Sequence, residues 1–450
     1  MSQDISSDVL VIGAGPAGIA AATIAAEQGL KVIVLDDNRQ PGGQIWRNLS
    51  TAHHPSTSKR HPKQQALDRL YRSGAQLLTR RVVFNASASG FAEALHETAT
   101  DSNVETFRFQ QLILATGARE RFLPFPGWTL PGVFGVGGLQ ALTRAGYPVA
   151  GKHIAVTGTG PLLLAVAAHL VAAGATVTTV AEQAPMLKLA PFAASLWRQP
   201  AKLVQGARYR TKLRSATYRT GCWVVKAIAS PDSHTLSAIH MTDGTRTWTE
   251  PCDLLACGYY LVPNTELAQL LGCALRGSFV QTDAHQRTSI LGIFCVGEPT
   301  GIAGLEAAIM QGKIAGLACA GKSTPKLLRR VMKQQVFAKN LEYAFALRQE
   351  LRSLPKQDTI VCRCEDVTFA AMQAYHGWTD AKLQTRCGMG PCQGRVCGPA
   401  AEFLLGWKPP ISMRQPLYPV PLRALSSPLA STSKVAINKI EGIESTKERI

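Results

Sequence analysis

The sequence contains no cysteine before Cys222 and no Cys-x-x-Cys pair anywhere in its 450 residues. Thiol–disulfide exchange enzymes use a reactive cysteine pair, so this absence excludes glutathione- or thioredoxin-reductase chemistry. The eleven cysteines are also unevenly placed, because five of them fall between Cys362 and Cys397. A secreted disulfide scaffold is shorter and more evenly crosslinked. The clustering therefore favours a bound cofactor over structural disulfides.

Charged residues are scarce, and acidic residues are the scarcer kind. Only 17% of the chain is charged, and 48 Lys and Arg against 30 Asp and Glu give a net charge of +18. Hydrophobic residues make up 46% of the chain, which excludes a disordered, collagenous or coiled-coil protein. The basic balance favours an anionic partner, but no nucleic-acid recognition module accompanies it, so we expect no nucleic-acid binding.

The sequence also lacks a signal peptide and a transmembrane segment. Residues 1–8 contain two aspartates and no basic region before the first apolar stretch. The longest charge-poor stretch, Ile154–Ala181, is interrupted by Gly158–Pro161 and by Gly174. These glycines predict a strand, turn, helix and strand rather than a membrane helix. We expect a soluble cytoplasmic protein, with attachment to the inner membrane through a partner left open.

The N-terminal region predicts a dinucleotide site. A short apolar strand leads directly into a Gly-x-Gly-x-x-Gly turn made by Gly13, Gly15 and Gly18, and an alanine-rich helix follows. The first glycine permits the tight turn, the second lets the backbone approach a diphosphate, and the third allows close helix–strand packing. The diphosphate is favoured by the free N–H groups at the helix N-terminus. Asp36 ends the next strand, where its carboxylate can accept both ribose hydroxyls.

Three later motifs favour FAD over NAD in this site. Pro41-Gly-Gly-Gln44 follows the acid, an apolar strand ends at Thr116-Gly117, and another ends at Gly297-Glu298 before the glycine-rich helix start at 301–305. With these motifs the chain resembles flavoproteins that have two dinucleotide-binding domains. The resemblance places Gln44 near the flavin, Gly117 at the domain crossing and Glu298 on the ribityl chain, although the family usually has Asp at the last position. The predicted FAD contacts are Gly13, Gly15, Pro16, Ala17, Gly18, Asp36, Gly43, Gln44, Thr116, Gly117, Gly297, Glu298, Gly304 and Leu305.

A second strand–turn–helix pattern contains Gly158 and Gly160, and its following strand ends near Glu182. Leu163 occupies the third glycine position, and this bulky residue loosens the close helix–strand approach of a dinucleotide site. We expect the fold to be kept, with NAD, another adenine nucleotide or no ligand as the open alternatives. No arginine pair follows Val180 to bind a 2′-phosphate, which disfavours NADP.

The cysteine-rich segment contains Cys362-x-Cys364 and, after a helical stretch, Cys387, Cys392 and Cys397. Four thiolates suit either zinc or a 2Fe–2S cluster. Structural zinc usually takes Cys-x₂₋₄-Cys, so Cys-x-Cys followed by Cys-x₄-Cys favours iron and resembles the modules related to bacterioferritin-associated ferredoxin. We predict Cys362, Cys364, Cys392 and Cys397 as ligands and Cys387 as a surplus thiol. Zinc and an empty reduced module are the alternatives.

Four motifs occur in one order, at Gly42–Trp46, Ala118–Val133, Gly158–Leu164 and Arg386–Arg395. Together they resemble the FAD-containing larger subunit of bacterial two-component amine oxidoreductases. That family covers opine oxidases, hydrogen cyanide synthase and proline or hydroxyproline dehydrogenases, and it is related to the sarcosine oxidase α chain. The resemblance spans about residues 5 to 425.

This resemblance implies that a smaller FAD-containing subunit, similar to D-amino-acid oxidases, oxidises the substrate. The present chain would relay electrons from flavin through the 2Fe–2S cluster. A stand-alone NAD(P)H-dependent flavoprotein reductase is the alternative, and a redox sensor is a third. Glycine, an opine and a proline derivative stay open as substrates, and so does the electron acceptor. No residue can be given a general-base role.

The expected fold class is α/β, with two Rossmann-like domains of disulfide-reductase-like flavoprotein architecture and a small C-terminal 2Fe–2S module. A hairpin is predicted at Thr242–Thr245. The helical linker at 323–356 is basic, and it is either solvated or a docking surface for an acidic partner subunit. His53, His54 and His61 are expected to be solvated. The predicted divisions are 1–125 and 251–322 for the FAD domain, 126–250 for the inserted domain, 323–356 for the helical linker, 357–424 for the 2Fe–2S module and 425–450 for a disordered tail.

Overall fold

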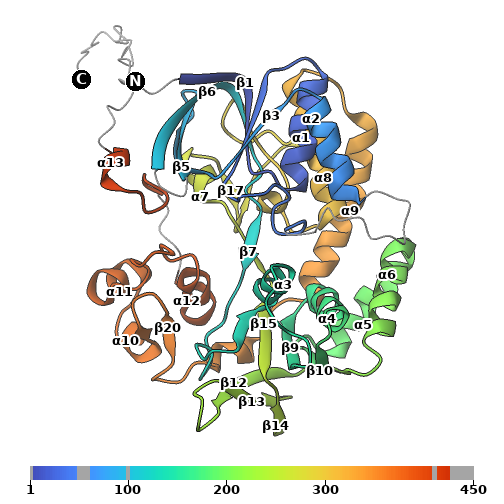
Figure 1. Ribbon diagram of the computed structural model, residues 1–450, viewed down its shortest axis with the longest axis vertical. Helices are drawn as coiled ribbons and strands as arrows, with labels where there is room; N and C mark the ends of the chain where they lie inside the picture. The colour runs from blue at the N-terminus through green and yellow to red at the C-terminus, as the bar shows by residue number, and fades with distance from the viewer. Residues whose placement is uncertain (1–3, 48–60, 98–101, 408–412, 426–450) are drawn as a thin grey trace, which may run out of the picture.

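The computed structural model describes residues 4–47, 61–97, 102–407 and 413–425. His53, His54 and residues 426–450 of the predicted tail lie outside these ranges. Figure 1 shows one α/β layer in the upper half of the molecule, a second in the lower half, and the cysteine-rich module beside the second. Among the described residues, no helix is long and apolar enough to span a membrane.

The first sheet has the strand order β3-β2-β1-β6-β5-β4, and β19 also pairs with β6. Strands β1, β2, β3, β6 and β19 are parallel to one another, whereas β5 pairs antiparallel with both β6 and β4. The apolar runs predicted before and after the first glycine turn are therefore adjacent buried strands. The strands are β1 (Asp4–Ile12), β2 (Val32–Asp36), β3 (Gln76–Thr79), β4 (Arg81–Ser87), β5 (Phe91–Glu97), β6 (Ser102–Leu114) and β19 (Ile293–Cys295).

Helices α1 (Pro16–Glu27) and α8 (Leu305–Cys319) pack against each other beside this sheet (Figure 1). Gly312 and Gly316 make the contact possible, because a Cβ at either position would overlap the backbone of α1. Helix α2 (Pro62–Arg72) packs against α1. His61 caps α2 by accepting a hydrogen bond from the Lys63 N–H.

The second sheet has the order β11-β10-β9-β15-β8, with every neighbouring pair parallel. A separate antiparallel sheet, β12-β13-β14, lies at the base of the molecule (Figure 1), and the predicted Thr242–Thr245 turn joins its last two strands. The strands are β8 (Val133–Gly135), β9 (His153–Thr159), β10 (Thr176–Glu182), β11 (Thr217–Thr220), β12 (Trp223–Ala229), β13 (Leu236–Thr242), β14 (Thr247–Pro251) and β15 (Leu254–Tyr259).

The chain crosses between the two α/β units later than the predicted boundary at residue 251. Strand β15 still belongs to the second sheet, because it pairs with β9. The two crossings are β7 (Ala118–Glu120) and β16 (Leu261–Pro263), which pair antiparallel. An apolar run such as β15 does not reveal from its sequence which of two parallel sheets it will join. The helices of the second unit are α3 (Val136–Arg144), α4 (Leu162–Ala172), α5 (Met186–Ser195), η1 (Leu196–Arg198) and α6 (Pro200–Lys212).

After the second crossing, short elements lead back to the first sheet and then to a long helix. Helix α9 (Pro325–Ala344) makes up most of the predicted basic linker. Its buried face, with Phe337 and Leu341, packs with Leu189 of α5 in one apolar cluster. The other elements here are α7 (Glu266–Leu270), β17 (Leu275–Arg276), β18 (Phe279–Val280), η2 (Glu298–Thr300) and η3 (Gln349–Ser353).

The cysteine-rich module has its own small core, which contains Val361, Phe369, Met372 and Leu404. The predicted end of this module at residue 424 is too late. Leu417 already lies in the core of the first sheet, and Ala424 packs against its strands β4 and β5. The elements are β20 (Ile360–Cys362), β21 (Val367–Thr368), α10 (Phe369–Gln373), α11 (Trp378–Thr385), α12 (Cys397–Leu405) and α13 (Leu422–Leu425).

Candidate cofactor sites

The first glycine turn forms one wall of a pocket at the carboxyl edge of the first sheet. A Cβ at Gly13 would overlap the Ala115 carbonyl, and a Cβ at Gly18 would overlap the Gly13 carbonyl. A Cβ at Gly15 would meet only the Gly43 Cα, 4.0 Å away. Packing thus demands glycine at the first and third positions, whereas the second borders open space where a diphosphate can approach.

The N-terminus of α1 faces this space. Gly15 is the N-cap residue, no side chain caps the helix, and its first turn contains no acidic residue. Gly15, Pro16 and Ala17 all line the pocket. The unpaired N–H groups and the helix dipole therefore suit a bound anion.

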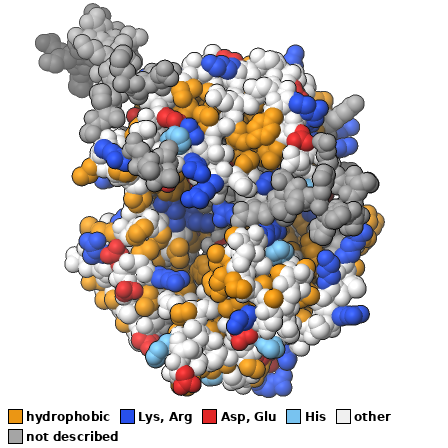
Figure 2. Space-filling view, in the orientation of Figure 1, with side chains coloured by type: hydrophobic (Ala, Val, Ile, Leu, Met, Phe, Trp, Pro, Cys, Tyr) orange, Lys and Arg blue, Asp and Glu red, His pale blue; other side chains and the backbone are white. Residues whose placement is uncertain are grey.

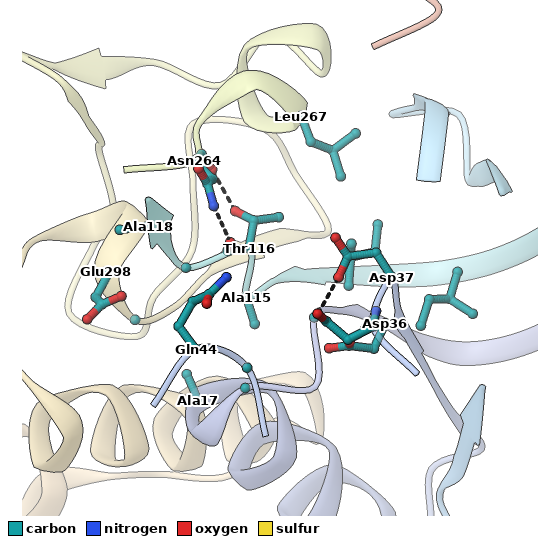
Figure 3. A pocket seen from close by; sticks show the side chains of 18 of the residues that line it. Ala17, Asp36, Asp37, Gln44, Ala115, Thr116, Ala118, Asn264, Leu267 and Glu298 are labelled. Atoms are coloured by element: carbon teal, nitrogen blue, oxygen red, sulfur yellow. Dashed lines mark hydrogen bonds between the residues drawn. The ribbon is translucent and has the colours of Figure 1, made fainter. Parts of the chain in front are cut away.

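Asp36 and Asp37 lie at one end of the pocket and Glu298 at the other, with Gln44 and Thr116 between them (Figure 3). Asp36 is held by two backbone donors, the Ala14 N–H at 2.6 Å and the Asn38 N–H at 2.9 Å. The Asn38 side-chain amide also donates to Asp36, at 3.0 Å. A carboxylate has about four acceptor positions, so Asp36 keeps capacity for about one ribose hydroxyl.

Two residues from different parts of the chain complete the middle of the pocket. The Thr116 hydroxyl donates to the Asn264 carbonyl oxygen at 2.6 Å, and the Asn264 side-chain amide donates to the Thr116 carbonyl oxygen at 2.8 Å. Figure 3 shows this reciprocal pair above Gln44. It joins the segment after β6 to the segment before α7, so the pocket wall includes Ala118 of the first crossing and the residue directly after the second.

Glu298 follows Gly297, whose φ of +80° turns the chain at the pocket edge. Burial raises the pKa of the Glu298 carboxyl to about 7. A ligand hydroxyl that donates a hydrogen bond to this carboxylate would favour its ionised form. The longer side chain of glutamate therefore places a usable acceptor at the position where aspartate is usual.

Most predicted FAD contacts meet in this one pocket. Gly18 instead supports the turn, and Gly304 and Leu305 begin α8 outside the lining. The predicted residues in the lining are Gly13, Gly15, Pro16, Ala17, Asp36, Gly43, Gln44, Thr116, Gly117, Gly297 and Glu298. Sequence reasoning missed Asp37, Asn38, Arg81, Val82, Val83, Asn264, Glu266, Leu267, Leu417 and Tyr418, which also line it. Only Asp37 and Asn38, directly after the predicted acid, carried a sequence signal.

The acid of the second glycine turn is held, like Asp36, by three donors. Glu182 is 1% exposed and accepts hydrogen bonds from the Gly160 N–H at 2.7 Å, the Thr159 hydroxyl at 2.7 Å and the Ala184 N–H at 2.9 Å. Burial raises the pKa of Glu182 to about 7, although these donors oppose the shift. Both carboxyl oxygens are thus engaged by the protein itself.

The chain after α9 crosses the carboxyl edge of this second sheet. The Thr159 hydroxyl lies 3.3 Å from the Phe345 carbonyl oxygen, and the Gln183 side-chain amide donates to the Ala346 carbonyl oxygen at 3.2 Å. The Arg348 N–H then donates to the Gln183 side-chain oxygen at 3.1 Å. Residues 345–348 therefore lie on the turn and beside the acid, where a dinucleotide would place its ribose.

The five clustered cysteines come together in the module. The sulfur atoms of Cys362, Cys387 and Cys397 all lie within 4.8 Å of one another, and the three residues are buried. The Cys392 thiol interacts with both Cys364 and Cys397. All five are free thiols. Cys387, which was predicted to be a surplus thiol, therefore lies within this group of cysteines.

The loop around these thiols requires its glycines. A Cβ at Gly390 would overlap the Cys364 side chain, and a Cβ at Gly388 would come within 2.7 Å of the Trp378 ring. The Gly388 N–H donates to the Cys362 sulfur at 3.4 Å. Hydrogen bonds from Cys387 and Cys397 lower the pKa of Cys362 to about 2. This set of closely spaced soft donors with a backbone N–H on sulfur suits an iron–sulfur cluster or zinc.

Arg395, between Cys392 and Cys397, connects this loop to the pocket. Its guanidinium donates to the Leu417 carbonyl oxygen at 2.8 Å and lies 4.1 Å from the centre of the Tyr418 ring. Its own carbonyl oxygen accepts from Arg119, which pairs with Glu266 at 2.8 Å. Figure 2 shows Lys and Arg side chains gathered in the hollow between the two halves of the molecule. The cysteine loop thus touches residues that line the first pocket.

Comparison with known proteins finds an oxidoreductase family and relatives that are named as enzyme subunits. The pyridine nucleotide-disulphide oxidoreductase family matches residues 7–312. An opine oxidase subunit of Rhizobium meliloti (strain 1021) is 32% identical over 92% of this chain and 97% of its own. Hydrogen cyanide synthase subunit HcnB of Pseudomonas protegens is 30% identical over 93% of this chain and 97% of its own. L-proline dehydrogenase from P. horikoshii, at 18% identity, shares the fold with a TM-score of 0.65 over 95% of this chain and 80% of its own.

Proposed function

Because this chain belongs to the pyridine nucleotide-disulphide oxidoreductase family and is a relative of an opine oxidase subunit, we propose that it is the relay subunit of a heteromeric amine- or imino-acid-oxidising complex. It is an FAD-dependent oxidoreductase. In the proposed complex it binds FAD in the first pocket and a 2Fe–2S cluster in the cysteine module. FAD accepts two electrons with a proton, and a 2Fe–2S cluster transfers electrons singly.

The contact between the cysteine loop and the pocket wall is the observation that carries this proposal. Arg395 lies three residues after Cys392 and bonds to the segment that supplies Leu417 and Tyr418 to the pocket. A module with a merely structural metal would not need to touch the flavin site. Here the two sites share one wall, which suits electron transfer between them.

The residues of the first pocket account for FAD binding. The N-terminus of α1 would hold the diphosphate, Asp36 would accept from a ribose hydroxyl, and Glu298 would accept from a ribityl hydroxyl. Cys362, Cys364, Cys392 and Cys397 hold the cluster. None of the described residues that line the pocket is a cysteine, so the disulfide chemistry in the family's name does not apply to this chain.

We place substrate oxidation in a partner, a smaller FAD-containing subunit that resembles D-amino-acid oxidases. The opine oxidase relative and hydrogen cyanide synthase subunit HcnB are both named as subunits, which supports a partner for this chain. The substrate class is an amine or imino acid such as glycine, an opine or a proline derivative. The closed carboxyl edge of the second sheet argues against the alternative of a stand-alone NAD(P)H-dependent reductase.

The test uses the full chain, purified anaerobically, first by itself and then with the smaller FAD-containing partner. By itself, it should show flavin and iron–sulfur absorbance but should not oxidise glycine, proline or an opine at a useful rate. With the partner present, the substrate should reduce both chromophores of this chain. Rapid turnover by the isolated chain would contradict the proposed division of labour.

A further inference from the structure

We propose that Cys387 is a reserve ligand of the cluster, able to take the place of Cys397 or Cys362 at one iron. This inference rests on the proposed iron–sulfur function and goes beyond its four predicted ligands. The chain carries five thiols in one group, whereas a 2Fe–2S cluster takes four.

The five thiols fall into two unequal groups. The exposed Cys364 and the half-buried Cys392 form an outer pair, and Cys392 also interacts with the buried Cys397. Cys362, Cys387 and Cys397 form the buried group, with all three sulfur atoms within 4.8 Å of one another. Four thiolates on two irons divide into two per iron. The outer pair can serve one iron, and the buried group then offers three thiols for the two positions at the other.

The backbone around Cys387 is shaped to bring its thiol into this group. Arg386 ends helix α11 in a left-handed conformation with φ of +63°, and Gly388 follows with φ of +80°. The Arg386 side chain bonds to Glu365, beside Cys364, at 2.9 Å. A left-handed conformation is costly for a residue with a side chain. Helices commonly end in this conformation, and here the turn brings Cys387 beside Cys362 and Cys397.

The closeness of the three buried sulfur atoms also favours replacement of one ligand by another. Cys387 is fully buried, and its thiol also lies 3.8 Å from the Met372 sulfur. No movement of a helix is needed for its thiol to approach an iron held by Cys362 and Cys397, since it already lies beside both sulfur atoms. Cys364 lies outside this buried group, so Cys387 is not expected to replace a ligand of the outer pair.

The experiment measures iron, acid-labile sulfide and the EPR spectrum of the reduced cluster in anaerobically purified full-length variants. Alanine is used, because a serine hydroxyl can itself bind iron. Cys387→Ala should keep about two iron per chain, as the wild type does. Cys397→Ala should keep most of its iron but show shifted g-values, because one ligand then comes from a different position on the segment between α11 and α12. Cys387→Ala combined with Cys397→Ala should lose most of the iron.

Cys392→Ala is the matched control, and it should lose its iron whether or not Cys387 is present. FAD content reports folding of the rest of the chain. If Cys397→Ala does not fold, Cys362→Ala with and without Cys387→Ala replaces it. Loss of iron from Cys397→Ala equal to the loss from the double variant would overturn the reserve role. A wild type without iron would instead overturn the proposed cluster itself.

Discussion

Gly15 has only a hydrogen atom where any other residue would place a side chain beside the pocket. The residue has φ of −74°, an ordinary value, so its backbone does not demand glycine. The space next to it does, because a side chain there would project between α1 and Gly43. Gly13 is glycine for a different reason, the close approach of the Ala115 carbonyl.

Gly15→Val is therefore expected to abolish FAD retention while leaving the fold intact, since valine fills the space of the diphosphate. Flavin absorbance per chain measures the effect. Gly377→Val is the matched control, because that glycine also has open space around its Cβ and lies in the cysteine module. Full flavin occupancy in Gly15→Val would show that the first site is misassigned.

Glu182 should make stability depend on pH. Its pKa in the folded protein, about 7, is above the ordinary glutamate value of 4.5, so the folded state holds a proton that the unfolded state releases. The stabilising effect of protonated Glu182 is complete below about pH 4.5 and is lost as the pH rises through 7. We expect the unfolding midpoint of the wild type to fall between about pH 5.5 and about 8 by more than that of Glu182→Gln. Parallel curves for the two proteins in thermal melts would rule this out.

At the scale of elements, one segment from outside the second unit lies at the carboxyl edge of its sheet. The second unit keeps the strand–turn–helix of a nucleotide-binding domain, but residues 345–348 bond to Thr159 and Gln183 at its carboxyl edge. Helix α9 holds this segment in place through Phe337 and Leu341, which pack on α5. The domain thereby anchors the chain that leads into the cysteine module.

Nicotinamide cofactors should therefore fail to reach the flavin. NADH or NADPH added anaerobically to the FAD-loaded protein is expected to leave the flavin absorbance unchanged for many minutes, because residues 345–348 bond to Thr159 and Gln183 beside the acid. Dithionite, which needs no binding site, should bleach the same sample and serves as the control. Bleaching by NADH within seconds would mean that residues 345–348 move aside and that the reductase alternative is correct.

At the scale of the whole molecule, Arg395 is one of the residues that join the FAD unit to the cysteine module. Arg395 contacts Leu417 and Tyr418, and its carbonyl oxygen accepts from Arg119. Before the module, residues 345–348 bond to the edge of the second sheet. After it, the segment 413–425 packs on the first sheet.

Arg395→Ala should loosen the module without unfolding it. Loss of a hydrogen bond from a charged group to a carbonyl is worth about 1.5–3 kcal/mol, and the guanidinium is only 15% exposed. Amide hydrogen exchange across residues 360–405 should quicken accordingly. Arg246→Ala removes an arginine that is 84% exposed and lies far along the chain, and it should leave exchange in the module unchanged. Equal protection in Arg395→Ala and wild type would show that the bridge does not hold the module.

The sequence alone was sufficient where the chemistry is local. The strand, the Gly13–Gly18 turn, the helix and Asp36 follow one another within about thirty residues, the length of a βαβ unit, and their spacing predicted the dinucleotide pocket that the structure contains. The same holds for the second glycine turn and for the hairpin at Thr242–Thr245. These features depend on backbone geometry and periodicity, which neighbouring residues specify.

Tertiary structure alone decided what fills or completes these sites. Phe345 lies on Thr159 from 186 positions away, and Asn264 reaches Thr116 from 148 positions away. Cys387 comes to lie beside Cys362 and Cys397 because α11 ends in a left-handed turn. Such contacts arise from the packing of whole elements. Neither the periodicity of α9 nor the spacing of the cysteines records where that packing brings a residue, so the segment at the edge of the second sheet and the position of the Cys387 thiol emerge only when the chain is folded.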